Sequence, residues 1–104
     1  MTLAISLLFA SNAAAHVGSY RQLVANDRPN RTGVLVFVVI NAALAVLVGL
    51  DLAWVRWPAL IFPLLGGLGL SATTIVPGEG TPIDFVILGL DMVIVAVVLF
   101  GLIL

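Results

Sequence analysis

The most unusual residue of this sequence is Asp91, an aspartate inside the most apolar stretch. That stretch, residues 82–104, reads PIDFVILGLDMVIVAVVLFGLIL and contains no basic residue. If it forms a helix, Asp91 lies about 13 Å from the helix start, close to the middle of a bilayer, where an aspartate costs about 3 kcal/mol. Asp91 must therefore bond to another helix, face a watery cavity or carry a proton.

The expected partners of Asp91 are polar residues in other apolar segments, namely Asn12 and His16 in the first segment and Asn41 in the second. Asn12, His16 and Tyr20 recur every four residues in the first segment. On a helix they form one polar stripe, which should face other helices or water rather than lipid. Asn41 interrupts the second segment. The candidate polar site is Asp91, Asn41, His16 and Asn12.

Two interpretations of this candidate site stay open. In the functional one, Asp91 carries a proton or binds a cation along a transport pathway, because acids inside membranes are functional by default. In the structural one, Asp91 bonds to a neighbouring helix or to a partner subunit. A proton path usually needs several polar stations, and segments 58–76 and 82–104 offer few, which favours the structural interpretation.

Other kinds of chemistry find little support in the sequence. The chain has no cysteine and one histidine, and its net charge is −1. There is no metal-ligand spacing, no glycine-rich phosphate loop and no nucleophile motif. We therefore expect a protein that is not an enzyme, with no cofactor and no metal. The small net charge gives no electrostatic footprint for nucleic acid.

The composition predicts the fold class. Of the 104 residues, 62% are hydrophobic and 9% are charged, too few charges for the surface of a soluble domain of this size. The apolar residues fall in runs of about 20, the length that crosses a bilayer as a helix. We predict an all-α integral membrane protein, with residues 1–104 as a single membrane domain and transmembrane helices at about 2–24, 33–54, 58–76 and 82–104.

The first segment allows another interpretation. Residues 1–15 have the apolar core and small residues of a secretory signal peptide, although no Lys or Arg precedes the apolar stretch. If this segment is cleaved or lies on the membrane surface, three transmembrane helices remain. A cleaved segment would also allow a secreted or pilin-like chain.

Small residues at helical spacing predict where helices pack. Asn41, Ala45 and Gly49 repeat every four residues, and Gly67 and Ser71 form another pair at this spacing. Such stripes let a neighbouring helix approach closely.

Between the second and third segments, WVRWP predicts a tight turn at the membrane surface. Trp54 and Trp57 suit the headgroup layer, and Arg56 can reach lipid phosphates. Pro58 suits the first position of the next helix. Pro63 should kink that helix or mark its first turn.

Capping residues mark two helix starts. Thr81 and Asp84 have the spacing of a capping box. Asn30 or Thr32 is expected to cap the helix at 33–54.

The distribution of arginines predicts the orientation. Arg21, Arg28 and Arg31, three of the four basic residues, lie around the first connection. Because positive charge favours the cytoplasmic side, loop 25–32 is expected to be cytoplasmic and both termini to face the opposite side.

Residues 34–72 resemble the small prokaryotic 2TM-domain membrane proteins, with an Asn in a first span, a tryptophan-and-proline turn and a glycine-rich second span. The histidines expected near the span ends of that family are absent here, and the family implies no defined reaction. The residues that carry the resemblance are Asn41, Trp54, Trp57, Pro58, Pro63, Gly67 and Gly69.

Together these features predict a non-catalytic membrane protein, an accessory or structural subunit that packs against a larger membrane complex. The alternative is a small homo-oligomeric channel or proton- or cation-coupled transporter that uses Asp91. The expected partners are membrane lipids and other membrane subunits or further copies of the chain.

Overall fold

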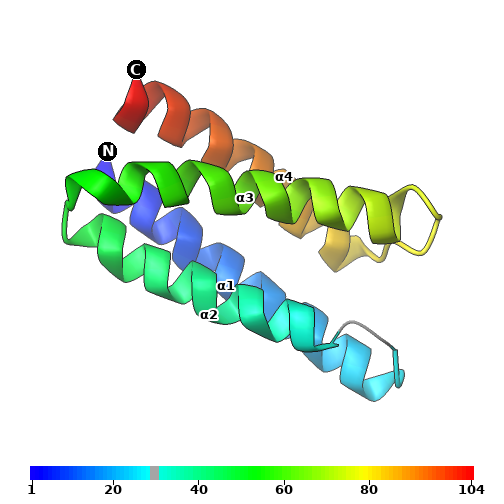
Figure 1. The fold of residues 1–104 in the computed structure, drawn as a ribbon. Coiled ribbons are helices and arrows are strands. Elements are labelled where there is room, and N and C mark those ends of the chain that lie inside the picture. Colours follow the sequence, from blue (N-terminus) through cyan, green and yellow to red (C-terminus); the bar gives the residue numbers. More distant parts are fainter. Residues whose placement is uncertain (29–30) are drawn as a thin grey trace.

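The structure, a computed structural model, describes residues 1–28 and 31–104. Within that part the chain is all-helical and contains no strand. Figure 1 shows the main helices side by side as a bundle. Their bounds are α1 Thr2–Ala25, α2 Arg31–Gly49, α3 Arg56–Leu70 and α4 Pro82–Val98.

Short helical turns extend two of these helices. The 3₁₀ turn η1, Ala53–Val55, leads directly into α3, and the π-helical turn η2, Ser71–Ile75, continues α3. A second π-helical turn, η3, Leu99–Ile103, continues α4. In the described part of the chain, four helical stretches are thus long and apolar enough to cross a membrane. The predicted all-helical fold and its four membrane-length helices are confirmed.

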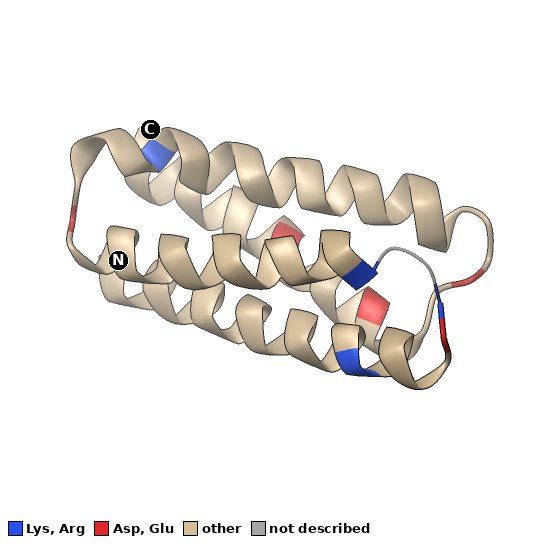
Figure 2. Cartoon of the chain, turned by 60° about the horizontal axis from the view of Figure 1, so that its bottom comes forward, with Lys and Arg blue, Asp and Glu red and all other residues tan. Residues whose placement is uncertain are grey.

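The two ends of the bundle differ in composition. One end holds the α1–α2 and α3–α4 connections with Arg21, Arg28 and Arg31, and we call it the arginine end. The other end holds the α2–α3 connection with Trp54 and Trp57, and both chain termini lie there; we call it the tryptophan end. In Figure 2 most of the charged residues gather at the arginine end.

The helices form an incomplete ring. α1 packs along both α2 and α4, and α3 packs along α4, whereas α2 and α3 meet only sparsely. In Figure 1 the α1–α2 pair and the α3–α4 pair diverge toward the arginine end. The bundle is therefore packed more tightly at its tryptophan end.

The hydrophobic core fills the half of the bundle nearest the tryptophan end. Its residues form pairs four positions apart, as expected for inward-facing positions of a helix. We call this core the apolar layer. It consists of Ile5, Phe9, Leu44, Val48, Val55, Ala59, Ile94 and Val98.

The predicted end of the second helix was wrong. α2 ends at Gly49 rather than at residue 54, because Asp51 takes a left-handed backbone conformation with φ of 57°, and such a residue ends a right-handed helix. The chain resumes helical structure at Ala53. Trp54 therefore lies in η1 and Arg56 and Trp57 in the first turn of α3, not in a tight turn.

The helix starts also differ from the predicted ones. α3 begins at Arg56, so Pro58 is its third residue, where the first turn still needs no N–H bond. α3 runs on through Pro63. α2 begins at Arg31, so Thr32 lies inside the helix and does not cap it, and Asn30 lies outside the described residues.

The predicted capping box is confirmed. The Thr81 backbone N–H donates to Asp84 Oδ2 at 2.8 Å, and the Thr81 hydroxyl donates to the same oxygen at 3.0 Å. These bonds explain why α4 begins where the sequence predicts.

The apolar layer can be tested with two phenylalanines. Phe9 is fully buried in the layer, whereas Phe100 is 72% exposed. Phe9→Ala should lower the free energy of unfolding by about 3–5 kcal/mol, because it leaves a cavity in close packing. Phe100→Ala, the matched control, should change it little. Thermal unfolding in mild detergent, followed by circular dichroism, measures both; equal losses would contradict the assigned core.

Candidate functional site

A hydrogen-bonded polar cluster lies in the middle of the bundle. Asn12 on α1 is fully buried, and Asp91 on α4 is 3% exposed. The Asn12 Nδ2 group donates to Asp91 Oδ1 at 2.7 Å and to Asn41 Oδ1 on α2 at 3.2 Å. Asn41 Nδ2 in turn donates to the Phe37 carbonyl at 2.8 Å. One side-chain amide thus joins three helices.

His16 lies one turn from Asn12 and extends the cluster. Its Nδ1 is 2.8 Å from the Asn12 carbonyl oxygen. Because a carbonyl oxygen only accepts, Nδ1 is the donor and carries the proton. The imidazole stacks on Phe37 of α2, with ring centroids 5.9 Å apart and an interplanar angle of 21°. The structure therefore brings Asn12, His16, Asn41 and Asp91 into one place.

Two oxygens of this cluster receive no hydrogen bond from residues 1–28 and 31–104: Asn12 Oδ1 and Asp91 Oδ2. We call them the open acceptors. Most buried polar groups in proteins are bonded, and a buried acceptor without a donor costs about 1–3 kcal/mol. Oxygens of this kind accept a hydrogen bond from water or another donor or bind a cation, and a carboxylate can also take a proton.

Two glycines of α3 let this helix approach Asp91. A Cβ atom on Gly66 would lie 3.3 Å from Asp91 Oδ2 and 3.3 Å from Phe37 Cε1. A Cβ atom on Gly67 would lie 3.6 Å from Asp91 Cβ. Gly67, predicted as a packing residue, is buried against α4, and Ser71 is half-buried in η2.

A cleft of about 600 Å³ lies on the arginine-end side of the cluster. Its inner end is formed by His16, Phe37 and Gly66, the residues that adjoin the cluster. Near its mouth, Arg28 Nη2 and Glu79 Oε2 are 3.1 Å apart, in an exposed ion pair. The cleft walls also carry polar side chains: Ser19, Gln22, Thr73, Thr74 and Asp84.

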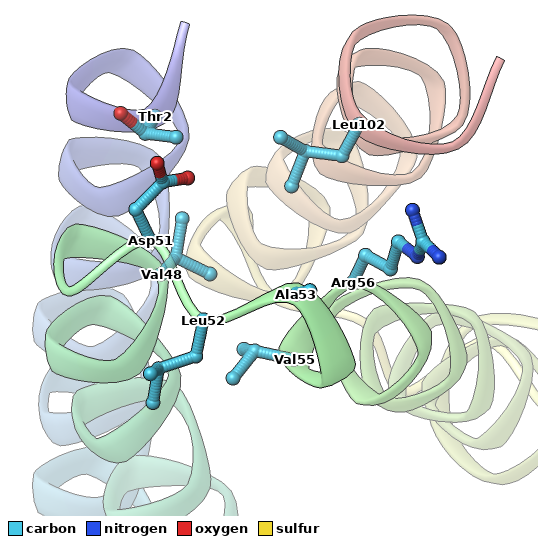
Figure 3. A pocket seen from close by; sticks show the side chains of 8 residues that line it. All are labelled: Thr2, Val48, Asp51, Leu52, Ala53, Val55, Arg56 and Leu102. Carbon is cyan, nitrogen blue, oxygen red and sulfur yellow. The ribbon is translucent and has the colours of Figure 1, made fainter.

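A smaller pocket of about 300 Å³ lies at the tryptophan end (Figure 3). Figure 3 shows Asp51 directed toward Thr2 on α1, with Arg56 on the other side of the pocket. Val48 and Val55, two members of the apolar layer, also line it. This pocket therefore ends on the apolar layer.

The predicted packing stripe on α2 faces α1. The Ser6 hydroxyl of α1 donates to the Ala45 carbonyl. A Cβ atom on Gly49 would lie 3.4 Å from Ser6 Oγ. Ala45 and Gly49 thus let α1 and α2 approach each other closely.

Sequence reasoning missed several residues of the site. Ser19 rather than Tyr20 continues the buried stripe of α1, because a spacing of four drifts off a face that repeats every 3.6 residues. The Gly66–Gly67 pair is visible in the sequence, but only the structure shows that Gly66 adjoins Asp91. Phe37 is one apolar residue within an apolar run, so nothing in the sequence distinguished it as a neighbour of His16.

No group of three or more His, Cys, Asp and Glu side chains within residues 1–28 and 31–104 is placed to hold a metal ion. No protein-family model, curated protein or solved structure matches the chain. What the chain does must therefore be inferred from its own residues and their geometry.

The central amide can be tested by removing it. Asn12→Ala deprives Asp91 Oδ1 and Asn41 Oδ1 of their donor, so the free energy of unfolding should fall by about 1–3 kcal/mol. Asn26→Ala is the matched control, since Asn26 is an exposed asparagine at the end of the same helix, and it should cost less than about 0.5 kcal/mol. Thermal unfolding in detergent compares the two; similar losses would show that the cluster does not hold the helices together.

Proposed function

We propose that this chain is an integral membrane protein whose four helices cross the bilayer, with loop 25–32 cytoplasmic and both termini on the opposite side. Four helical stretches of membrane length support this. The arginine end carries three of the four basic residues, as cytoplasmic ends do. Trp54 and Trp57 are largely exposed at the other end, where indole rings suit the headgroup layer.

The packing of α1 supports four spans rather than three. Ile5 and Phe9 are fully buried in the apolar layer, and Asn12 supplies the central amide of the polar cluster. Removal of residues 1–15 as a signal peptide would take all three away. We therefore propose that α1 stays in the bundle.

Two exposed alanines test the orientation, because the chain has no cysteine of its own. Ala25 ends α1 at the arginine end, and Ala53 begins η1 at the tryptophan end. In sealed vesicles of known orientation, a membrane-impermeant maleimide should label Ala25→Cys only from the cytoplasmic face and Ala53→Cys only from the opposite face. The cysteine-free chain is the blank. Labelling of both variants from one face would overturn the four-span orientation.

We further propose that the protein binds and passes a proton or small cation at Asp91, as a small channel or a proton- or cation-coupled transporter. The observation that carries this proposal is Asp91 Oδ2, an open acceptor that packs against Gly66 at the inner end of a cleft with polar side chains in its walls. A carboxylate that served only to join helices would gain from having both oxygens bonded. This one leaves Oδ2 without a hydrogen bond from the described residues, and only Gly66 separates it from the cleft.

The neighbouring residues have distinct tasks in this proposal. Asn12 Nδ2 holds Asp91 Oδ1 and so directs Oδ2 toward Gly66. His16 lines the cleft and has Nδ1 fixed on the Asn12 carbonyl. The remaining ring nitrogen, Nε2, is the one that can exchange a proton with the cleft. Asp91 binds the ion, and His16 is the next polar station toward the arginine end.

The second candidate function is an accessory subunit that packs against a larger membrane complex or against further copies of the chain. The observation that favours it is the bond from Asn12 Nδ2 to Asp91 Oδ1, which gives Asp91 a structural task within the bundle. In that case Asp91 stabilises the subunit internally and does not reach a partner, because it is buried.

A flux measurement separates the two functions. In proteoliposomes with an imposed proton gradient or labelled Na⁺ or K⁺, the unaltered chain should conduct, and Asp91→Asn should abolish the flux while thermal unfolding stays close to that of the parent. Asp51→Asn, an exposed carboxylate in the tryptophan-end pocket, is the matched control and should keep the flux. Absence of flux, together with a stoichiometric partner after gentle purification from the native membrane, would replace transport with the accessory function.

A further inference from the structure

We infer that the polar cluster is open to the arginine end alone, through the cleft, and that the apolar layer seals it from the tryptophan end. This inference rests on the proposed membrane placement and says from which side the proposed ion site is reached. In the described conformation, protons or small cations exchange between Asp91 and the cytoplasmic face only.

The cleft provides the open side. Its volume of about 600 Å³ is far more than one water molecule needs, and polar side chains occur along it among apolar ones such as Val34, Leu65 and Leu70. Gln22, Glu79 and Thr81 lie toward the mouth, and Ser19 and His16 lie deeper. These groups can hold water or a hydrated cation along the way to the cluster.

Gly66 lies between the cleft and Asp91. It lines the cleft, as Phe37 does. A single Cβ atom at this position would be 3.3 Å from both the Phe37 ring and Asp91 Oδ2. Asp91 Oδ2 thus packs directly against Gly66, and only this residue without a side chain separates it from the cleft. At Gly69, another glycine of the cleft, a Cβ atom would meet no described atom within 4 Å.

The apolar layer provides the closed side. On each helix of the cluster, the next inward residue toward the tryptophan end is fully or nearly fully buried and apolar. In the direction of the tryptophan end, Asn12 of α1 is succeeded by Phe9. In the same direction, Asn41 of α2 is succeeded by Leu44, and Asp91 of α4 by Ile94. One turn further toward the tryptophan end, each of these helices adds a second buried apolar residue to the layer: Ile5, Val48 and Val98.

The tryptophan-end pocket does not bridge this seal. It is lined by Val48 and Val55, which belong to the apolar layer. A charge that crossed the layer would lose its water without gaining a polar partner, which is strongly unfavourable. Release of an ion to the tryptophan end therefore requires the layer to part.

Two isoleucines of α4 test the inference as a matched pair. Ile87 lies one turn before Asp91 and lines the cleft, whereas Ile94 lies one turn after it in the apolar layer. Both are buried and lie near the face of α4 that carries Asp91. Each is replaced by cysteine in the otherwise cysteine-free chain. A positively charged, membrane-impermeant methanethiosulfonate is then added to one face of sealed vesicles at a time.

We expect Ile87→Cys to react from the arginine-end face and to lose that reaction when the reagent is on the other face. Ile94→Cys should react from neither face. If Ile87→Cys does not assemble, Ser19→Cys takes its place, since Ser19 is buried on α1 and lines the same cleft.

The inference is overturned if Ile94→Cys reacts as fast as the cleft variant, if the cleft variant resists the reagent from the arginine-end face, or if it reacts from the tryptophan-end face. Thiol labelling needs no ion flux. If labelling is one-sided but no flux is measured, the transport proposal is wrong and the one-sided access holds. If flux is measured but labelling occurs from both faces, the transport proposal holds and the one-sided access is wrong.

Discussion

A single amide group, Nδ2 of Asn12, carries the interaction on which the bundle depends. It donates to Asp91 of α4 and to Asn41 of α2, so three helices must keep the register that puts these residues at one level. In an apolar surrounding the alternative is unbonded polar groups, which are costly. α3 has no side-chain bond of this kind in the described chain; it joins through Gly66 and Gly67, whose missing side chains let its backbone approach Asp91.

The cluster also divides the bundle into two halves with different physical character. Toward the tryptophan end the inward positions are Phe9, Leu44 and Ile94, which pack into the apolar layer. Toward the arginine end the inward positions include the polar residues His16 and Ser19, and the helix pairs diverge around the cleft. Apolar side chains can interlock closely and leave no room for water, whereas a cavity with polar groups in its walls can hold it. The asymmetry of the bundle thus follows from the order of residues along each helix.

The sequence was sufficient for the coarse fold because apolar runs of membrane length have few other solutions. It also pointed to Asn12, His16, Asn41 and Asp91, since a polar residue inside such a run needs a partner from another run. The end of α2 at Gly49 was missed because it depends on the left-handed conformation of Asp51, which neighbouring residues do not dictate.

The cleft and its contacts lay beyond sequence reasoning for a different reason. The Arg28–Glu79 pair joins residues far apart in the chain, and the volume between helices depends on how far they diverge. Neither the ion pair nor the cleft volume is signalled by residues that lie close together in the sequence. Gly66 is similar: two adjacent glycines predict close packing, but which of them meets the open oxygen of Asp91 depends on the rotation of α3 against α4.

The choice of residue at position 91 bears on function. An asparagine there would accept the same bond from Asn12 Nδ2 through its own Oδ1. It would also avoid much of the cost of about 3 kcal/mol for placing an aspartate at the bilayer centre. What a carboxylate adds over an amide is the ability to bind and release a proton or to neutralise a cation. In this bundle Asp91 Oδ2 has no hydrogen-bond donor among the described residues and is separated from the cleft only by Gly66. There that ability can offset the higher cost, which is why we favour ion binding over a purely structural role for Asp91.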